Sequence, residues 1–363
     1  MPIRLLCALS ALALCGGYLA AAEEETFDPN TTAQQPGLVK QEFIYVEPQH
    51  PQCHATTIAE TPSGLVAAWF GGTHEKNPDV GIWLSRHIEG EWSTPVEVFN
   101  GVQEDGTRHP CWNPVLHQVK DGPLVLFYKV GPDPRTWWGM MAKSDDDGQT
   151  WGDPVRLPDE IPGPIKNKPY VLEDGTLLSP TSTENEGWRV QIDWTQDEGR
   201  TWHSTGPLND GHEIGAIQPS IVHYGDKLQI LCRSRQGRIA EAWSDNWGRT
   251  WSEMTLSEMP NNNSGTDAVN LKDGGVVLIY NHVGNGKRDR SPLNLAYTED
   301  GKNWQAVLVF ESNPGEYSYP AIIQTDDGMI HATYTYKRRR VKHVVIDPAQ
   351  LVKQPIVDGE WPQ

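Results

Sequence analysis

Residues 144–151 read SDDDGQTW, and the same turn recurs with small changes at residues 195–202 (TQDEGRTW), 244–251 (SDNWGRTW) and 298–304 (TEDGKNW). A degenerate copy ends at residues 89–92 (EGEW). The Trp residues that close these turns are about 50 positions apart, which is the length of one four-stranded propeller blade. In each turn, Ser, Thr and Asp accept hydrogen bonds from nearby amides, Gly permits a positive φ, and Trp anchors the turn on the blade. The pattern therefore indicates a structural role for these turns and no catalytic one.

A second repeat sets the number of blades. A Gly-containing turn followed by an apolar strand begins near residues 63, 121, 174, 225, 273 and 327. Each copy fits a hairpin between the first two strands of a blade, and no long amphipathic helix lies between copies. The sequence predicts an all-β fold, a six-bladed β-propeller over residues 41–350 with four antiparallel strands per blade. We expect a strand from residues 41–47 to close the ring on the last blade, because an open sheet edge would otherwise remain.

The two ends of the chain read as segments outside the propeller. Arg4, the apolar run 5–14 and the small residues up to Ala22 are typical of a secretory signal peptide over residues 1–22. They predict a secreted or periplasmic protein with cleavage near Ala22; lipid attachment at Cys15 is the alternative, which the large Leu14 disfavours. Residues 23–40 form a polar lead-in and residues 351–363 a C-terminal tail. No later stretch has the roughly 20 apolar residues of a membrane span.

Charge and cysteine content narrow the function further. The formal net charge of −18 argues against a nucleic acid partner, because such proteins need a basic face to release counterions. Removal of the signal leaves Cys53, Cys111 and Cys232, an odd number that allows one disulfide at most. Cys53 and Cys111 begin equivalent repeat elements, so a bridge between them and a pair of free buried thiols both stay open.

Each predicted inner strand opens with a polar or aromatic residue that is followed by Pro or Ala. Equivalent positions on radial blades face the same end of the channel, so we expect these side chains to surround one mouth. Converging polar and titratable groups are typical of a site for a small ligand. The six residues are His54, Asn113, Lys168, Gln218, Asp267 and Tyr319.

The repeats, together with residues 79–82 (DVGI), residues 231–233 (LCR) and a Tyr in the final blade, resemble the sialidase superfamily with its BNR, or Asp-box, repeats. The resemblance covers about residues 41–347. It implies a glycan-processing enzyme. We expect no cofactor, and no metal because no closely spaced pair of His residues accompanies His74 and Asp79. Asp79 resembles the acid/base of a sialidase, Tyr319 its nucleophile, and Arg233 one of three arginines that bind the substrate carboxylate.

The departures from the family pattern concern the arginines and the partner of the tyrosine. His54 stands where the first arginine is expected, and residues 280–282 (YNH) stand where the remaining one is expected. Gln218 replaces the Glu that pairs with the Tyr. Since arginines bind a carboxylate in a bidentate way, we expect typical sialidase activity to be weak or absent. Because Gln218 cannot take a proton from Tyr319, His54 or Lys168 would have to act as base.

These residues lead to an exo-acting glycoside hydrolase on an acidic or decorated oligosaccharide or polysaccharide. Two alternatives remain: a lyase that cleaves a uronic acid glycan by β-elimination, and a non-catalytic glycan-binding propeller. Residues 137–138 (WW) offer either a sugar-stacking platform or core packing, and the basic run 337–340 (KRRR) predicts an exposed face. The predicted catalytic residues are Asp79, Tyr319 and His54, and the predicted substrate-binding residues are Lys168, Gln218, Arg233, Asn113, Asp267 and Arg235.

Overall fold

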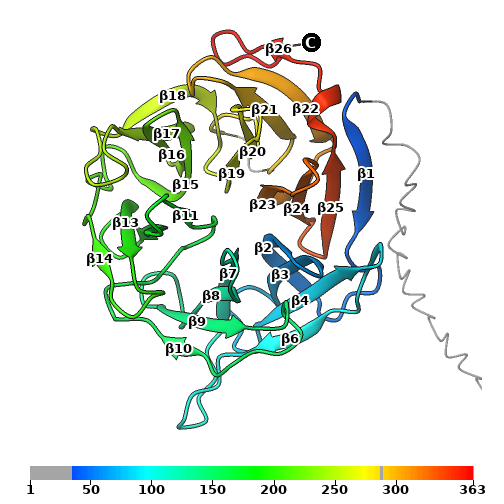
Figure 1. Ribbon diagram of the computed structural model, residues 1–363, viewed down its shortest axis with the longest axis vertical. Coiled ribbons are helices and arrows are strands. Elements are labelled where there is room, and N and C mark those ends of the chain that lie inside the picture. Colours follow the sequence, from blue (N-terminus) through cyan, green and yellow to red (C-terminus); the bar gives the residue numbers. More distant parts are fainter. Residues whose placement is uncertain (1–34, 287–288, 363) are drawn as a thin grey trace, which may run out of the picture.

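The computed structural model describes residues 35–286 and 289–362 and shows six antiparallel sheets arranged around a central channel (Figure 1). The predicted six-bladed propeller is confirmed. The predicted signal peptide and Cys15 lie outside the described residues. Over the described ranges, no helix has the length and apolar character that crossing a membrane requires.

The first three blades follow one another along the chain, each as a separate sheet. The first contains β2 (Gln52–Thr61), β3 (Gly64–Gly72), β4 (Gly81–Ile88), β5 (Glu91–Trp92) and β6 (Val96–Phe99). The second contains β7 (Cys111–Gln118), β8 (Leu124–Val130), β9 (Trp138–Ser144) and β10 (Val155–Arg156). The third contains β11 (Tyr170–Val171), β12 (Leu177–Thr183), β13 (Arg189–Thr195) and β14 (His203–Ser204).

The other three blades include both ends of the described chain. The fourth contains β15 (Ala216–Tyr224), β16 (Lys227–Ser234), β17 (Arg238–Ser244) and β18 (Thr255–Pro260). The fifth contains β19 (Asp267–Asn270), β20 (Val276–Tyr280), β21 (Leu293–Thr298), β22 (Gln305–Glu311) and β26 (Gln354–Pro355). The sixth contains β23 (Tyr317–Gln324), β24 (Ile330–Tyr336), β25 (Arg340–Ile346) and β1 (Leu38–Phe43). A 3-10 turn, Pro348–Gln350, follows β25.

The N-terminal strand closes the ring, as the sequence predicts. β1 pairs antiparallel with β25, from Leu38 opposite Ile346 to Phe43 opposite Lys342. It begins three residues before the predicted propeller boundary and ends before residue 47, since the chain turns away after Phe43. The pairing covers an edge of the sixth blade that would otherwise offer free backbone groups to another chain.

The hydrophobic core lies in the seams between neighbouring blades. One cluster joins the first two blades through residues such as Leu84 and Leu126, and another joins the fifth and sixth through Ile279 and Tyr334. Within the described part of the chain, Cys53, Cys111 and Cys232 are buried and free, so the disulfide considered for Cys53 and Cys111 does not form. Each sits in a different cluster as a small apolar side chain.

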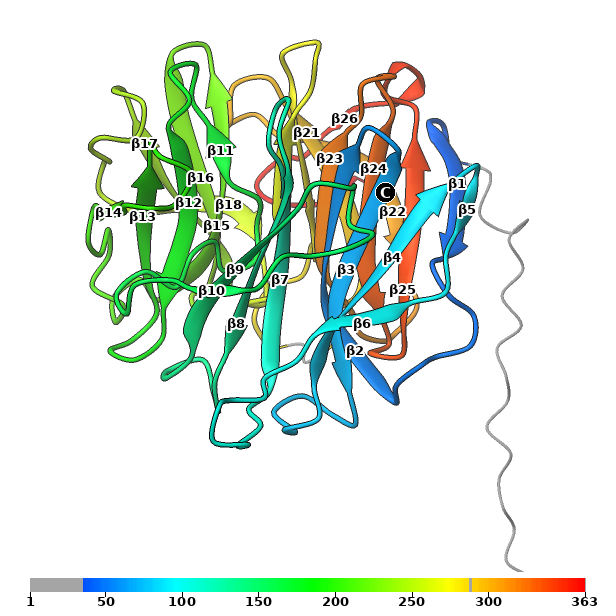
Figure 2. The same cartoon turned by 60° about the horizontal axis from the view of Figure 1, so that its bottom comes forward.

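The strands run between two opposite ends of the propeller (Figure 2). The repeated turns follow the third strand of their blades and lie together at one end. In the second blade, Asp146 accepts hydrogen bonds from the backbone N of Thr150 at 2.8 Å and from its hydroxyl at 2.6 Å. The closing Trp151 packs on the seam between the first two blades. The turns thus stabilise the hairpins at this end of the propeller, and the predicted site residues are expected at the opposite end.

Four of the innermost strands carry the same irregularity near that other end. Ala55, Asn113, Gln218 and Tyr319 have positive φ angles of 56°, 36°, 58° and 49°, and at each of them the register with the next strand shifts. Such β-bulges re-aim side chains, and left-handed backbone at a residue other than Gly is strained. Ala55, rather than His54, is therefore the structural equivalent of Tyr319.

Candidate active site

Tyr319 lies at the bulge of β23, and its phenol oxygen accepts two hydrogen bonds. Nη1 of Arg233 donates at 2.8 Å and Nε2 of Gln218 at 3.2 Å. The His54 ring lies against the phenol, with the ring centroids 4.1 Å apart. Behind the ring, a Cβ placed on Gly265 would approach it to 3.2 Å, so only Gly fits there without displacement. Tyr319 is held in one orientation with its oxygen facing charged and polar donors.

Three arginines from three different blades surround this pair of rings. The guanidinium carbons of Arg233 and Arg290 lie 5.6 Å and 5.4 Å from the centre of the Tyr319 ring. Nε2 of His54 lies 3.4 Å from Nη1 of Arg290 and 3.5 Å from Nη2 of Arg338. Arg233 ends β16, Arg290 precedes β21, and Arg338 lies in the turn between β24 and β25.

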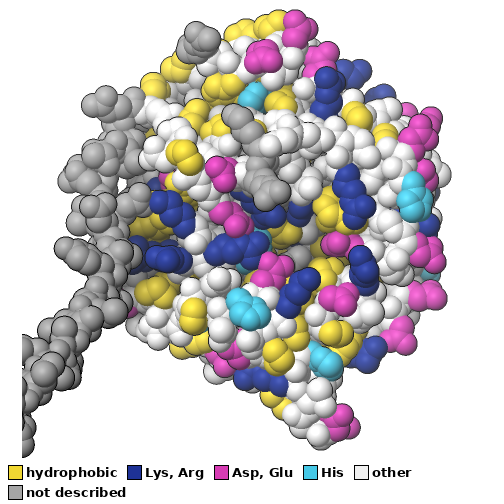
Figure 3. Space-filling view, turned by 180° about the vertical axis from the view of Figure 1, so that it is seen from behind, with side chains coloured by type: hydrophobic (Ala, Val, Ile, Leu, Met, Phe, Trp, Pro, Cys, Tyr) yellow, Lys and Arg dark blue, Asp and Glu magenta, His cyan; other side chains and the backbone are white. Residues whose placement is uncertain are grey.

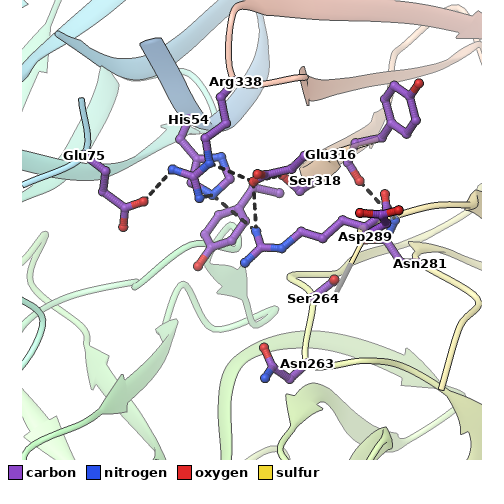
Figure 4. A network of polar contacts seen from close by, with 12 residues as sticks. His54, Glu75, Asn263, Ser264, Asn281, Asp289, Glu316, Ser318 and Arg338 are labelled. Atoms are coloured by element: carbon purple, nitrogen blue, oxygen red, sulfur yellow. Dashed lines mark hydrogen bonds and ion pairs between the residues drawn. The ribbon is translucent and has the colours of Figure 1, made fainter. Parts of the chain in front are cut away.

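Two glutamates only partly balance these charges. Glu316 accepts from Nε of Arg338 at 2.8 Å and lies 3.5 Å from Nη1 of Arg290. Glu75 pairs with the opposite side of Arg338 (Figure 4). Arg233 instead donates to the side-chain oxygens of two neutral amides. Lys and Arg side chains gather around the centre of this end of the protein (Figure 3), although the whole chain carries a net charge of −18.

His54 is a neutral imidazole in this setting. Burial lowers its pKa well below the usual value, and the positive charges of Arg338, Arg290, Arg233 and Lys166 lower it further. Because guanidinium groups only donate, Nε2 of His54 is assigned as the acceptor and Nδ1 carries the proton. The one acceptor nitrogen of the neutral ring therefore faces the two arginines, and His54 helps to hold them in place.

A buried lysine lies below the two rings. Nζ of Lys166 donates to the carbonyls of Pro320 and Thr266 and to the side chain of Asn167. Burial lowers the pKa of Lys166 to about 7. Its contacts join the segment after Tyr319 to the loop that carries Gly265, so it holds these two segments together.

Two predicted substrate-binding residues lie deeper in the channel and contact each other. Nζ of Lys168 is 2.8 Å from Oδ2 of Asp267, and the same oxygen accepts from the backbone N of Ile322 at 2.9 Å. Lys168 precedes β11 and Asp267 begins a regular strand, so neither lies at a bulge. Their contacts hold the third, fifth and sixth blades together. Lys168 and Asp267 are therefore not part of the group of residues around Tyr319.

Trp188 forms one wall of the mouth. Arg235 stacks on its ring with the guanidinium carbon 4.4 Å from the centroid, and Arg233 does so at 5.1 Å. The indole donates to Glu184 at 3.0 Å, and burial raises the pKa of that carboxyl group. Arg235 is exposed and lies on the rim.

A cleft of about 880 Å³ adjoins this wall between the second and third blades. Glu184, Arg135 and Trp137 are among its lining residues. Trp137 also packs edge-on against Trp112, with the centroids 5.8 Å apart, and Trp138 packs against the core of the first two blades. Core packing is thus observed for both tryptophans, and sugar stacking stays a prediction.

Asp79 lies in the loop between β3 and β4, at the same end of the propeller. Its carboxylate accepts from the backbone N of Thr73 at 3.1 Å, and its backbone carbonyl accepts from Arg108 at 2.8 Å. The side chain is exposed. Glu75, in the same loop, is the carboxylate that contacts Arg338.

The structure thus brings together His54, Gln218, Arg233 and Tyr319, and places Asn113 at the corresponding bulge of the second blade. Sequence reasoning missed Arg290 and Arg338. Its expectation that two of the three arginines are absent is therefore wrong, and the reason given for weak sialidase activity no longer holds. The exposed-face prediction for residues 337–340 is wrong for Arg338, whose side chain is 24% exposed and faces His54. The basic run was a usable signal, but its place in a tight turn concealed the direction of the side chain.

A six-bladed propeller with Asp-box turns at one end and a tyrosine among arginines at the other defines a member of the sialidase superfamily. The chain belongs to the BNR repeat-like domain family, whose model matches residues 63–332. It is 22% identical over 255 residues to a sialidase of Bacteroides fragilis (strain YCH46), a match that covers 58% of this chain and 45% of that protein. The chain therefore spans less than half the length of this relative.

Solved structures show the same fold. A Dyadobacter fermentans DSM 18053 protein of unknown function has a TM-score of 0.70 at 16% identity, covering 86% of this chain and 99% of that chain. The NanB sialidase from Streptococcus pneumoniae has a TM-score of 0.67 at 13% identity, covering 86% of this chain and 71% of that chain. At such identities the likeness establishes the architecture alone.

Proposed function

We propose that this protein is a secreted, exo-acting glycoside hydrolase that acts on a terminal sugar bearing a carboxylate. One observation carries the proposal: Arg233, Arg290 and Arg338 converge on the face of Tyr319 and His54. Charge-assisted hydrogen bonds from guanidinium groups are the strongest that a protein offers to a carboxylate. An anionic sugar would also complete the charge balance that Glu75 and Glu316 leave unfinished.

In this proposal the arginines orient the sugar and Tyr319 supplies the electron-rich oxygen. Glycoside hydrolysis passes through an oxocarbenium-like state, which needs a nucleophile or negative charge on one face and a proton donor at the leaving oxygen. Tyr319 stabilises the anomeric carbon, and Asp79, in its protonated form and released from Thr73, gives its proton to the leaving oxygen. The Asp79 carboxylate then takes a proton from the water that attacks the anomeric carbon, which restores the acid. Arg233 and Gln218 both donate to the phenol oxygen, so the phenol's own proton passes to solvent when Tyr319 acts as nucleophile.

A second candidate is β-elimination from a uronic acid, and the surroundings of the Tyr319 phenol favour it. Among the described residues, the cationic Arg233 and the neutral Gln218 donate to the phenol oxygen, and no carboxylate contacts it. Tyr319 would remove the proton at C5, and the arginines would neutralise the uronate carboxylate. His54 would act as the base only once its Nε2 is released from Arg290 and Arg338. This reaction needs no covalent intermediate, so Gln218 in place of Glu would not impair it.

Product analysis separates the candidates. The mature protein is incubated with a methylumbelliferyl sialoside, uronic acid glycans, and sulfated or rhamnose-containing polysaccharides. Hydrolysis releases a saturated sugar with a new reducing end, and elimination yields an unsaturated uronide with new ultraviolet absorbance. The hydrolase proposal fails if unsaturated products form. Both enzyme proposals fail if every acidic glycan is bound and none is cleaved, and the glycan-binding propeller then stands.

A further inference from the structure

A second cleft lies at the end of the propeller opposite Tyr319. It has a volume of about 710 Å³ and lies between the third and fourth blades. Its walls are the turn between β11 and β12, which starts at Leu172, and the Asp-box turn of the fourth blade, residues 244–251. β16 begins at Lys227 beside this end and reaches Arg233 at the mouth, so the length of a blade separates the cleft from the candidate active site.

Trp247 in this cleft is an exception within the repeat. The same position of the turn holds Asp147 in the second blade and Glu198 in the third, and all three residues are left-handed, with φ of 57°, 61° and 58°. A bulky residue is unfavourable in that conformation, which Asp and Asn tolerate. Trp247 is also 39% exposed. The neighbouring Trp251 is the one that packs on the seam, so core packing does not explain Trp247.

The other lining residues match the chemistry of a sugar. Trp194 supplies a second aromatic ring, and Gln196, Glu173 and Arg249 supply polar groups around it. Aromatic walls with a few polar groups are typical of a ligand site, and the C–H face of a pyranose stacks on indole. Two carboxylates, of Glu173 and Asp174, outnumber the single guanidinium, which favours an uncharged sugar over an anionic one.

We propose that this cleft is a second glycan-binding site, which takes uncharged pyranose units of a carbohydrate chain. It is independent of the chemistry at Tyr319. A site at the opposite end holds the protein on a polymer while the mouth samples acidic chain ends, which raises the local concentration of substrate.

Affinity electrophoresis tests the site in gels that contain galactomannan, xyloglucan or laminarin. Trp247→Asn removes the aromatic ring and places in the turn a residue that tolerates the left-handed backbone. Asp147→Asn makes the matching change in the second blade. We expect at least one of these polymers to retard the wild-type protein and Asp147→Asn equally, and the dissociation constant of Trp247→Asn to rise at least about tenfold, the loss that removal of one stacked ring produces.

Two further variants make the result decisive. Tyr319→Phe should be retarded like the wild type, and Trp247→Tyr should bind with intermediate affinity because it keeps an aromatic face. The proposal is overturned if none of the three polymers retards the wild-type protein, if Trp247→Asn binds as the wild type does, or if Tyr319→Phe abolishes binding. The last result would assign binding to the mouth.

Discussion

Replacement of Arg290 by Met tests the carboxylate site with little risk to the fold. Nη1 of Arg290 lies 3.5 Å from Glu316, but Glu316 keeps its bond of 2.8 Å with Arg338, so no carboxylate is left unpaired. Met keeps most of the length and apolar surface of the side chain. A hydrogen bond from a charged group contributes about 1.5–3 kcal/mol. At about 1.4 kcal/mol per factor of ten, kcat/KM for an acidic glycan should fall roughly 10- to 150-fold.

The assay compares each acidic glycan that the wild-type protein cleaves with its methyl ester, in which the carboxylate charge is absent. The loss in kcat/KM should be large for the acid and small for the ester. Arg235→Met is the control, because Arg235 stacks on Trp188 at the exposed rim and should lower kcat/KM about fivefold or less. An equal loss for acid and ester would refute a carboxylate contact at Arg290.

Three further results are expected. Burial lowers the pKa of His331 to about 4, below its usual 6.5. Between these pH values the unfolded chain binds more protons than the folded protein, so the free energy of unfolding decreases as pH drops from 6.5 to 4. Chemical denaturation of His331→Gln should show a smaller decrease over this range, and the same decrease as in the wild type would contradict the lowered pKa. Asp146→Ala should lower Tm by several degrees, because Asp146 accepts three hydrogen bonds within its turn. The control Asp145→Ala, which replaces the exposed neighbour, should leave Tm almost unchanged. Equal shifts of Tm for the two variants in thermal scans would contradict the structural role of Asp146. Gln218→Glu puts a carboxylate where an amide lies 3.2 Å from the Tyr319 oxygen; if that phenol is the nucleophile, kcat should rise severalfold with a new acidic limb in the pH–rate profile, and a large loss of kcat would argue against it.

The fold was predictable because its repeats consist of turns whose conformation depends on a few neighbouring residues. The Asp-box turns and the hairpin glycines are short-range patterns, so each blade can be recognised in the sequence. The positions of the β-bulges were harder to predict from the sequence. Sequence alignment paired His54 with Tyr319, but the register shift makes Ala55 the equivalent residue. The pair His54-Ala55 matches the pattern of a polar residue followed by Pro or Ala, but the bulge of that strand begins one residue later, at Ala55. The position of a bulge leaves no trace in composition.

The candidate site was only partly predictable, for a related reason. Arg233 and Tyr319 lie on strands of the repeated blade unit, so the repeat pattern in the sequence pointed to both. Arg290 and Arg338 lie in a loop and a turn outside the repeat, where the backbone sets the direction of the side chain. Lys168 fitted the pattern by residue type, but it precedes a two-residue strand and points into the channel instead.

The rate of glycan cleavage by Tyr319→Phe tests the central claim most directly. The change removes one oxygen, which accepts from Arg233 and Gln218, and keeps the ring against His54. On the acidic glycan that the wild-type protein cleaves, kcat should fall roughly 100-fold or more, with Tm within a few degrees of wild type. Cleavage by the variant at the wild-type rate would contradict the account and place the chemistry elsewhere.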